Sequence, residues 1–263
     1  MEEKILKWLS ENGYPLEMRI ARQLGKAQFD VTQSHFYTDY ESGKHREIDV
    51  LGRLYDFIEP DEYIAISELE TFCTVECKSA TNPWVVFTET QPSSWNLEQA
   101  AANEGGEKLI IRASKALKTT KLVMRSRVAG HGIAQAFGGG ADIPYSAVMS
   151  AMKAAEAKAT EAFKEVGINS NMSLSVAVVP AVVISAPLFE CRLNDQMEPE
   201  LRRVRSAALA LRYPKERKSL RTTAVIHVVT EDGWSEFMEE LREFHNALKT
   251  ELHTLIPPDP DQT

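Results

Sequence analysis

Three charged residues lie in two short, largely apolar segments that are typical of buried β-strands. Asp49 belongs to the segment Arg46–Leu51, and Glu76 and Lys78 belong to the segment Phe72–Lys78. Side chains of a strand alternate between its two faces, so Glu76 and Lys78 point to the same side. An Asp brought beside that pair gives two carboxylates and an ammonium in one place. Two carboxylates suit a hard divalent cation with oxygen ligands, and a lysine beside them suits a phosphate or an attacking water.

The cost of burying charge decides between two interpretations of these residues. Unpaired charges in a strand near the core are costly, so they must be paired, solvated or bound to a metal. In one interpretation, Glu76 and Lys78 form an ordinary ion pair on a solvated strand. The neighbouring Val75 and the apolar run Pro83–Phe87 instead favour a strand near the core, and therefore a functional role.

The order of these residues resembles the motif of the PD-(D/E)xK nuclease superfamily, which includes restriction enzymes, repair nucleases and phage-defence effectors. In that motif an Asp is followed, a few tens of residues later, by Glu-x-Lys on a second strand. Here Tyr40–Lys44 has the composition of a hairpin turn that leads into the strand of Asp49. Leu16–Leu24 resembles the family's first helix. The resemblance covers about the first third of the chain, with Ile48 where the proline of the motif would stand.

The resemblance implies an α/β fold, namely a restriction-endonuclease-like core with a central mixed β-sheet flanked by helices, plus helical elaborations. We expect a single nuclease-like domain over residues 1–256, with its core at 14–95 and an elaborated part at 96–256. A disordered tail is expected at 257–263. A chain of 263 residues is long enough to bury the core of one such domain.

The resemblance also implies roles for five residues. Asp49, Glu76 and Lys78 would be catalytic, and Asp49 and Glu76 would hold Mg²⁺, for which Mn²⁺ can substitute, together with the main-chain carbonyl oxygen of Cys77. Glu17 is a further candidate ligand, although the helix dipole also favours an acid in the first turn of a helix. Lys78 would orient or deprotonate the attacking water, and as a base it would need a depressed pKa.

The charge of the chain is uneven. The formal net charge is −8, whereas nucleic-acid-binding proteins usually present a positive surface. Between Arg202 and Arg221, however, eight Arg and Lys residues stand against the single acid Glu216. One interpretation of this run is a solvated face or a mobile connection. The other is a patch that contacts phosphates. The residues predicted for such a patch are Arg202, Arg203, Arg205, Arg212, Lys215, Arg217 and Lys218.

Cysteine content and hydropathy indicate the reducing cytoplasm and no membrane. Three cysteines provide no disulfide framework, and the N-terminal residues lack the basic and apolar regions of a secretory signal. The longest apolar stretch, Leu174–Phe189, is interrupted by Pro180 and Pro187. It is too short for a comfortable membrane span and is predicted to be a buried strand.

Hydrophobic periodicity and turn residues predict the remaining elements. Helices are expected at 2–11, Pro15–Lys26, 95–104, 107–123, 144–166 and from Trp234 to about Leu255. Strands are expected at about 28–40, 45–55, 71–79, 173–193 and 222–230. The glycine-rich patch within residues 125–146 is expected to be a mobile loop near the active site, serving as a lid or an oligomer contact.

These observations predict a Mg²⁺-dependent endonuclease that hydrolyses phosphodiester bonds, with DNA as the expected substrate and prokaryotic defence or repair as the expected role. A catalytically inactive relative that binds nucleic acid or acts as a scaffold is the main alternative. A third interpretation is an enzyme that uses Lys78 as a nucleophile toward a carbonyl or phosphate substrate. Assembly into a homo-oligomer is left open by the sequence.

Overall fold

The computed structural model describes residues 1–58, 67–88, 101–102, 119–138, 142–166, 173–212 and 223–254. Within these residues the helices are α1 (Glu2–Glu11), α2 (Tyr14–Lys26), α4 (Lys121–Arg127), α5 (Ile143–Val166) and α6 (Trp234–Thr254), the last preceded by the 3₁₀ turn η2 (Glu231–Gly233). The strands are β1 (Asp30–Asp39), β2 (Lys44–Ile58), β3 (Ser67–Lys78), β4 (Trp84–Phe87), β5 (Ala101–Ala102), β6 (Gly132–Gln135), β7 (Ser173–Ile184), β8 (Leu188–Leu193), β9 (Pro199–Val204), β10 (Ser206–Arg212) and β11 (Thr223–Thr230).

A mixed sheet in the order β1-β2-β3-β7-β11-β10 forms the centre of the protein, and β5 pairs with β7 beside it. The first three strands are an antiparallel meander that begins with the predicted hairpin, where Gly43 has a φ of +66°. β3, β7 and β11 then run parallel to one another, and β10 is antiparallel to β11. Parallel neighbours need a crossover connection, and α5 lies between β3 and β7 in the chain. The α/β class with a mixed sheet flanked by helices is therefore confirmed.

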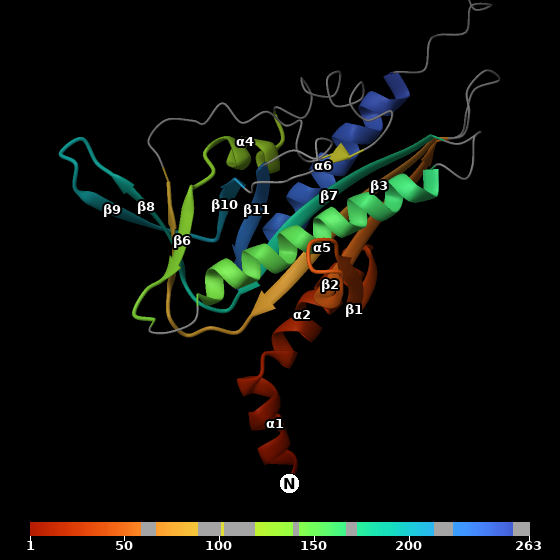
Figure 1. Cartoon of the computed structure of the whole chain (residues 1–263). Coiled ribbons are helices and arrows are strands. Elements are labelled where there is room, and N and C mark those ends of the chain that lie inside the picture. Colours follow the sequence, from red (N-terminus) through yellow and green to blue (C-terminus); the bar gives the residue numbers. More distant parts are fainter. Residues whose placement is uncertain are drawn as a thin grey trace, which may run out of the picture.

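Helices cover both faces of this sheet (Figure 1). α5 packs on one face through small side chains such as Ala147 and Ala151, which are fully buried. α2 and α6 contribute to the core on the other face, with Ile20 and Trp234 among its buried members. Since β7 is covered on both faces, its residues form a nearly continuous apolar run instead of an alternating one.

A second sheet, in the order β6-β4-β8-β9, leaves the main one at Ser185–Pro187. The prediction of one strand over 173–193 was therefore wrong, because β7 ends at Ile184 and β8 begins at Leu188 in the other sheet. Ser185 marks the exit, where its hydroxyl accepts a hydrogen bond from the Ala80 N–H and donates one to the Ala80 carbonyl, each at 3.0 Å. Hydropathy does not reveal this change of sheet because both strands are apolar.

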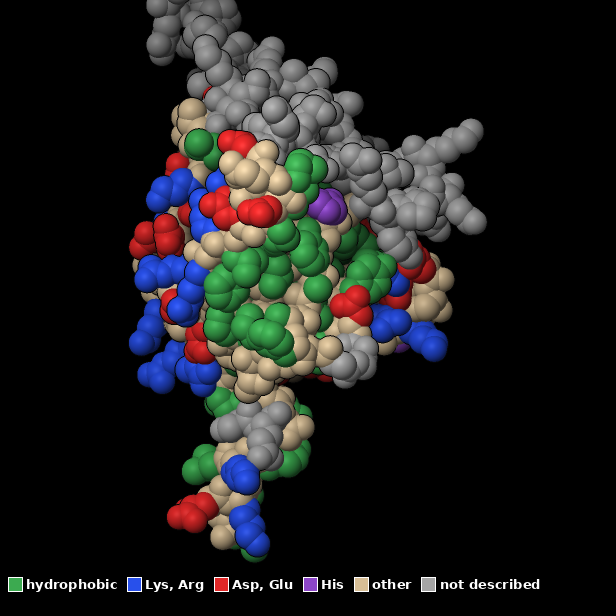
Figure 2. All heavy atoms as spheres, turned by 90° about the vertical axis from the view of Figure 1, so that its left-hand side faces the viewer, with side chains coloured by type: hydrophobic (Ala, Val, Ile, Leu, Met, Phe, Trp, Pro, Cys, Tyr) green, Lys and Arg blue, Asp and Glu red, His purple; other side chains and the backbone are tan. Residues whose placement is uncertain are grey.

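One face of the second sheet is apolar and partly exposed. The register of its strands puts six such side chains on that face: Val85, Phe87, Phe189, Cys191, Leu193 and Leu201. Figure 2 shows hydrophobic side chains gathered on this side of the molecule, with charged side chains around them. The sheet is held to the protein through its other face, where Trp84, Val86 and Leu188 are fully buried.

Several local predictions need correction. Ala101–Ala102 form strand β5 instead of the predicted helix 95–104, whose other residues lie outside the described ranges. Of the predicted helix 107–123, the described part is helical only from Lys121, and this helix continues to Arg127. The predicted helices 2–11, Pro15–Lys26, 144–166 and the C-terminal one are confirmed as α1, α2, α5 and α6. The tail 257–263 lies outside the described residues.

In its described part, the glycine-rich segment is not the predicted mobile loop, and residues 139–141 lie outside the described ranges. Gly132–Gln135 form strand β6, and Gly130 joins the two sheets. Its N–H donates to the Ala208 carbonyl and its carbonyl accepts from the Ala210 N–H, both at 2.8 Å. A Cβ at Gly130 would lie 2.4 Å from Val86 Cγ1, so a side chain cannot fit there. Within the described residues, no helix is both long and apolar enough to cross a membrane.

A buried hydrogen-bonded chain attaches α6 to the sheet. His245 Nδ1 lies 2.8 Å from Thr71 Oγ1, and His245 Nε2 lies 2.8 Å from Asp56 Oδ2. Lys249 Nζ contacts the other oxygen of Asp56 at 2.6 Å. The order hydroxyl, imidazole, carboxylate is that of a hydrolytic triad, but Thr71 is only 1% exposed. No substrate can reach its hydroxyl, so this arrangement is structural.

We expect His227 to reduce the stability of the fold between pH 7 and pH 5. His227 on β11 is 3% exposed, and burial, assisted by Arg125, lowers its pKa to about 3. In the unfolded chain its pKa is about 6.5, so only the unfolded state takes up a proton between these values, and stability present above pH 6.5 is lost on acidification. The loss at pH 5 from this residue is about 2 kcal/mol. Melting temperatures of the wild type and His227→Leu, each compared at pH 7 and pH 5, test this.

Each protein is compared with itself at the two pH values, so the packing cost of the substitution, which is the same at both, cancels. Other titrating groups, such as Asp49, contribute equally in both proteins, so from pH 7 to pH 5 the melting temperature of the wild type should shift downward relative to that of the variant. An equal shift in both proteins would mean that His227 accepts a proton in the folded state.

Candidate active site

Asp49 lies where β2 separates from β3. The ladder between these strands begins at the pair Val50–Val75, so Asp49 is one residue beyond it. Ile48 packs against α5, whereas Val50 packs with the core that contains α2. Residues two apart in a regular strand share a face, so the strand is irregular at Asp49. On the neighbouring strand β1, Gln33 pairs with Val50 and His35 pairs with Ile48. Ser34, between them, has a φ of +53°, a left-handed conformation that is uncommon for a residue with a side chain.

The carboxylate of Asp49 occupies the gap left by the missing backbone pair. Its Oδ2 accepts a hydrogen bond of 2.6 Å from the main-chain N–H of Cys77. In a strand the N–H and C=O of one residue leave toward the same neighbouring strand, so the Cys77 carbonyl also faces this gap. The Lys78 carbonyl points the opposite way and accepts a hydrogen bond of 3.3 Å from the N–H of Ser185.

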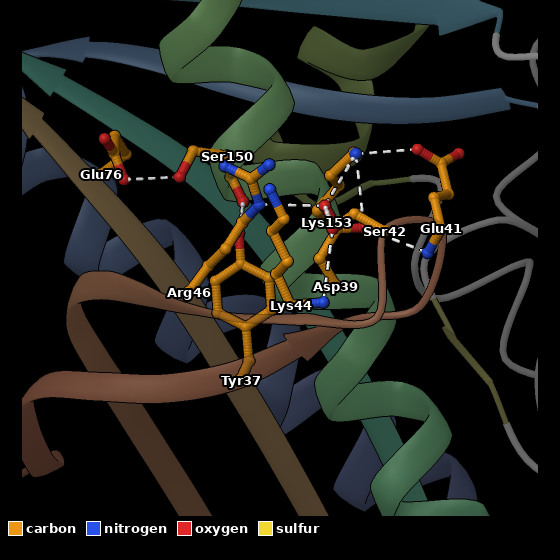
Figure 3. A network of polar contacts seen from close by, with 9 residues as sticks. All are labelled: Tyr37, Asp39, Glu41, Ser42, Lys44, Arg46, Glu76, Ser150 and Lys153. Carbon is orange, nitrogen blue, oxygen red and sulfur yellow. Dashed lines mark hydrogen bonds and ion pairs between the residues drawn. The ribbon is translucent and has the colours of Figure 1, made fainter.

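Glu76 and Lys78 share a face, as predicted, and form a close ion pair. Lys78 Nζ lies 2.5 Å from Glu76 Oε1. Ser150 of α5 donates a hydrogen bond of 2.9 Å to the other oxygen of Glu76 (Figure 3). Glu76 is 7% exposed, whereas the Lys78 side chain retains 29% exposure. The pair is therefore buried on the side of the carboxylate and open to a ligand on the side of the ammonium.

Ser150 is a site residue that sequence reasoning missed. It belongs to a polar network on one side of α5, seen in Figure 3, where Tyr37 donates to the Ser150 carbonyl at 3.4 Å. One turn further, Lys153 binds the buried carboxylate of Asp39, which also accepts from Arg46. Residues three apart on a helix are neighbours, so Ser150 and Lys153, as polar residues of an alanine-rich helix, were a signal for this contact surface.

The electrostatics of the site depend on the two acids and the lysine. Burial, reinforced by the negative charge of Glu76, raises the pKa of Asp49 to about 7, although the Cys77 N–H and Lys78 oppose this shift. Burial alone would lower the pKa of Lys78, but the carboxylates of Glu76 and Asp49 outweigh it and raise that pKa. Lys78 is therefore an ammonium at neutral pH, and the site carries an excess of negative charge that a cation would relieve.

Glu17 lies at the margin of the same site. It is in the first turn of α2, and burial raises its pKa while the charge of Lys78 opposes this. It also acts electrostatically on Asp49, so it is within range of the other acids. Arg19, on the same turn, donates two hydrogen bonds of 2.5 and 3.1 Å to Glu231, which hold α2 at this edge of the sheet.

The donor atoms fit a cation that retains water ligands better than one enclosed by protein. Among the described residues, no three Asp, Glu, His or Cys side chains are arranged to share a metal ion. The available oxygens are those of Asp49 and Glu76 together with the Cys77 carbonyl. Mg²⁺ commonly uses one or two carboxylates, substrate phosphates and several waters, so this set suits it. To bind the ion, Glu76 would have to give up part of its contact with Lys78.

The predicted basic patch is divided by the structure. Arg202 and Arg203 belong to β9, so the run is not a mobile connection there, and they point to opposite faces. Arg202 pairs with Glu190 at 2.5 Å, whereas Arg203 and Arg205 line a groove. Arg212 is the last residue of β10. The predicted patch residues Lys215, Arg217 and Lys218 lie outside the described residues.

Comparison with known proteins gives no relative. No protein-family model matches the chain, and no curated protein or solved structure is significantly similar to it. Only the residues of the site therefore indicate a function for this protein.

We expect Asp49→Asn to stabilise the metal-free protein at pH 8. A pKa raised from about 3.8 to about 7 means that the stabilising contribution of the protonated acid is lost as the pH rises through 7. The amide keeps an oxygen for the Cys77 N–H and removes the charge, with a gain on the order of 3 kcal/mol. Melting temperatures in EDTA should be several degrees higher for the variant at pH 8 and nearly equal at pH 4.

The exposed Asp195, on the turn between β8 and β9, provides a control. Asp195→Asn should leave the melting temperature unchanged at both pH values. An unchanged or lower melting temperature of Asp49→Asn at pH 8 would contradict the conclusion that the ionised carboxylate of Asp49 destabilises the metal-free protein.

Proposed function

We propose that this protein is a Mg²⁺-dependent nuclease that hydrolyses phosphodiester bonds in DNA, built on a restriction-endonuclease-like core. The observation that carries the proposal is the convergence of Asp49, Glu76 and Lys78 at the point where β2 separates from β3. The order of helix α2, the β1–β2 hairpin and the third strand supports it, since it is the order of elements in the family that the motif resembles. A role in defence or repair within the cytoplasm belongs to the same proposal.

The chain's own residues account for positioning in this reaction. Asp49 and Glu76 would hold the ion, with the Cys77 carbonyl beside them and Glu17 as an outer acid. An ion held there would supply Lewis-acid chemistry that activates the scissile phosphate and the attacking water. The Cys77 N–H fixes one oxygen of Asp49, and Ser150 fixes one oxygen of Glu76. Both carboxylates are thus oriented before any ligand arrives, which reduces the cost of reorganisation.

Lys78 acts as a fixed positive charge in this mechanism. A lysine needs a depressed pKa to take a proton from water or to attack a carbonyl, whereas the carboxylates raise the pKa of Lys78. Its ammonium would orient the attacking water and stabilise the negative charge that develops on the phosphate. The same shift argues against the alternative in which Lys78 is a nucleophile.

The inactive, nucleic-acid-binding relative remains the second candidate. The observation in its favour is that Lys78 and Ser150 already occupy both oxygens of Glu76. In that case the ion pair would be a structural replacement for the metal. The two candidates differ in whether a divalent ion binds at Asp49 and Glu76.

Cleavage assays test the proposal directly. Plasmid, linear duplex and single-stranded substrates are incubated with the purified protein, with and without Mg²⁺. We expect cleavage that requires the metal and that Asp49→Asn, Glu76→Gln and Lys78→Met each reduce by roughly a hundredfold or more. Glu190→Gln, which breaks a comparable ion pair in the second sheet, should cut like the wild type. Undiminished cutting by Lys78→Met would overturn the assignment.

Metal binding separates the two candidates without a substrate. At pH 8 Asp49 is mostly ionised, and an ion that binds only the folded protein raises its melting temperature. We expect Mg²⁺ or Mn²⁺ to raise the melting temperature of the wild type by a few degrees and that of Asp49→Asn or Glu76→Gln by much less. A wild type that does not respond to either ion would favour the inactive relative.

A further inference from the structure

A groove lies at the same edge of the main sheet as the candidate site. Its volume is about 740 Å³, and it is lined by residues that follow β7 and β11 and by the junction of β9 with β10. The members that matter here are Ser185, Arg203, Arg205, Thr230, Glu231 and Asp232. Ligands of open α/β sheets commonly bind beyond the carboxyl ends of parallel strands, which is where this groove lies.

The groove lies two strands away from Lys78 along the same edge of the sheet. Lys78 is paired with Ile184 on β7, and Ile184 is paired with Thr230 on β11. Neighbouring strands lie about 4.8 Å apart, so the backbone of Thr230 is roughly 10 Å from that of Lys78. Ser185 bridges this interval, because its N–H donates to the Lys78 carbonyl at 3.3 Å. A chain-like ligand bound at Lys78 can therefore extend into the groove.

Arg205 is rigidly anchored in the wall of the groove. Its carbonyl accepts hydrogen bonds from the N–H of Thr230 at 2.8 Å and from the Thr230 hydroxyl at 3.1 Å. Gly233 packs directly against it, where an added Cβ would lie 2.7 Å from the Arg205 carbonyl oxygen. The backbone is thus fixed, while the side chain is 67% exposed and can contact a ligand.

The acids of the groove do not neutralise its arginines. Glu231 is already bound by Arg19 through two hydrogen bonds. Asp232 is 3.6 Å from Arg205 and both side chains are well exposed, so this pair is weak and easily exchanged. Arg203 has no ion-pair partner among the described residues. The lining contains no aromatic side chain among those residues, so it offers guanidinium groups without a stacking platform for bases.

We propose that this groove holds the sugar–phosphate backbone next to the scissile phosphate, with Arg203 and Arg205 contacting successive parts of it. This inference rests on the proposed nuclease function and adds how the substrate is held. Recognition by guanidinium–phosphate contacts alone is independent of base sequence and sensitive to salt. Arg202, although adjacent to Arg203, belongs to the opposite face of β9 and takes no part.

Binding measurements without cleavage test this inference. Labelled DNA oligonucleotides of two unrelated sequences, as single strands and duplexes, are titrated with Glu76→Gln protein in EDTA over a series of salt concentrations, and anisotropy is recorded. In this background, Arg203→Gln with Arg205→Gln should weaken binding by roughly tenfold or more at low salt, equally for both sequences. The slope of log K against log salt should fall by about 1 for each arginine.

A matched control has the same change in net charge. Arg192 and Arg202 pair with Glu200 and Glu190 on the opposite face of the β8–β9 hairpin, so Arg192→Gln with Arg202→Gln should bind within about twofold of the parent. Equal loss in both double variants, an unchanged salt slope, or no binding by the parent would overturn the inference. If the arginine variants bind normally while the wild type cleaves DNA with Mg²⁺, only the groove is wrong and the nuclease proposal stands.

Discussion

The hydrogen bond from the Cys77 N–H to the carboxylate of Asp49 is the contact on which the site depends. It exists because the backbone pairing of β2 with β3 stops at Val50 and Val75, which leaves one N–H of β3 without a strand partner on that side. A carboxylate replaces the missing carbonyl. The acid is thereby held at the end of the ladder instead of inside either core layer, and the main-chain oxygen of Cys77 is directed into the same gap.

The fold supports this arrangement by covering the sheet unequally. α2 and α6 close one face with large apolar side chains, and α5 closes the other with alanines that allow a close approach. The close approach of α5 brings Ser150 to the oxygen of Glu76 and Lys153 to Asp39. The carboxylates of Glu76 and Asp39 are therefore both ion-paired and hydrogen-bonded. Asp49 has the hydrogen bond from the Cys77 N–H but no ion pair among the described residues, and its pKa of about 7 reflects burial and a neighbouring acid that are only partly compensated.

The long parallel strands connect the site to the rest of the edge. β3, β7 and β11 end side by side, so the residues that follow them form a continuous border from Lys78 to Thr230. The second sheet begins at this border, and its last strand brings Arg203 and Arg205 to it. An acidic protein can in this way present positive charge where a phosphate backbone would have to lie. The overall net charge of −8 does not describe this edge.

The sequence by itself determined the local features. The strand period put Glu76 and Lys78 on one face and Cys77 on the other, and turn composition located the hairpin before Asp49. These follow from backbone geometry over a few residues. The tertiary structure alone decided where β2 leaves β3, that Ser150 reaches Glu76, and that the apolar run after residue 173 changes sheet at Ser185. The physical reason is that strand pairing and helix docking join residues far apart in the chain, and a local hydropathy pattern is the same whichever partner is chosen.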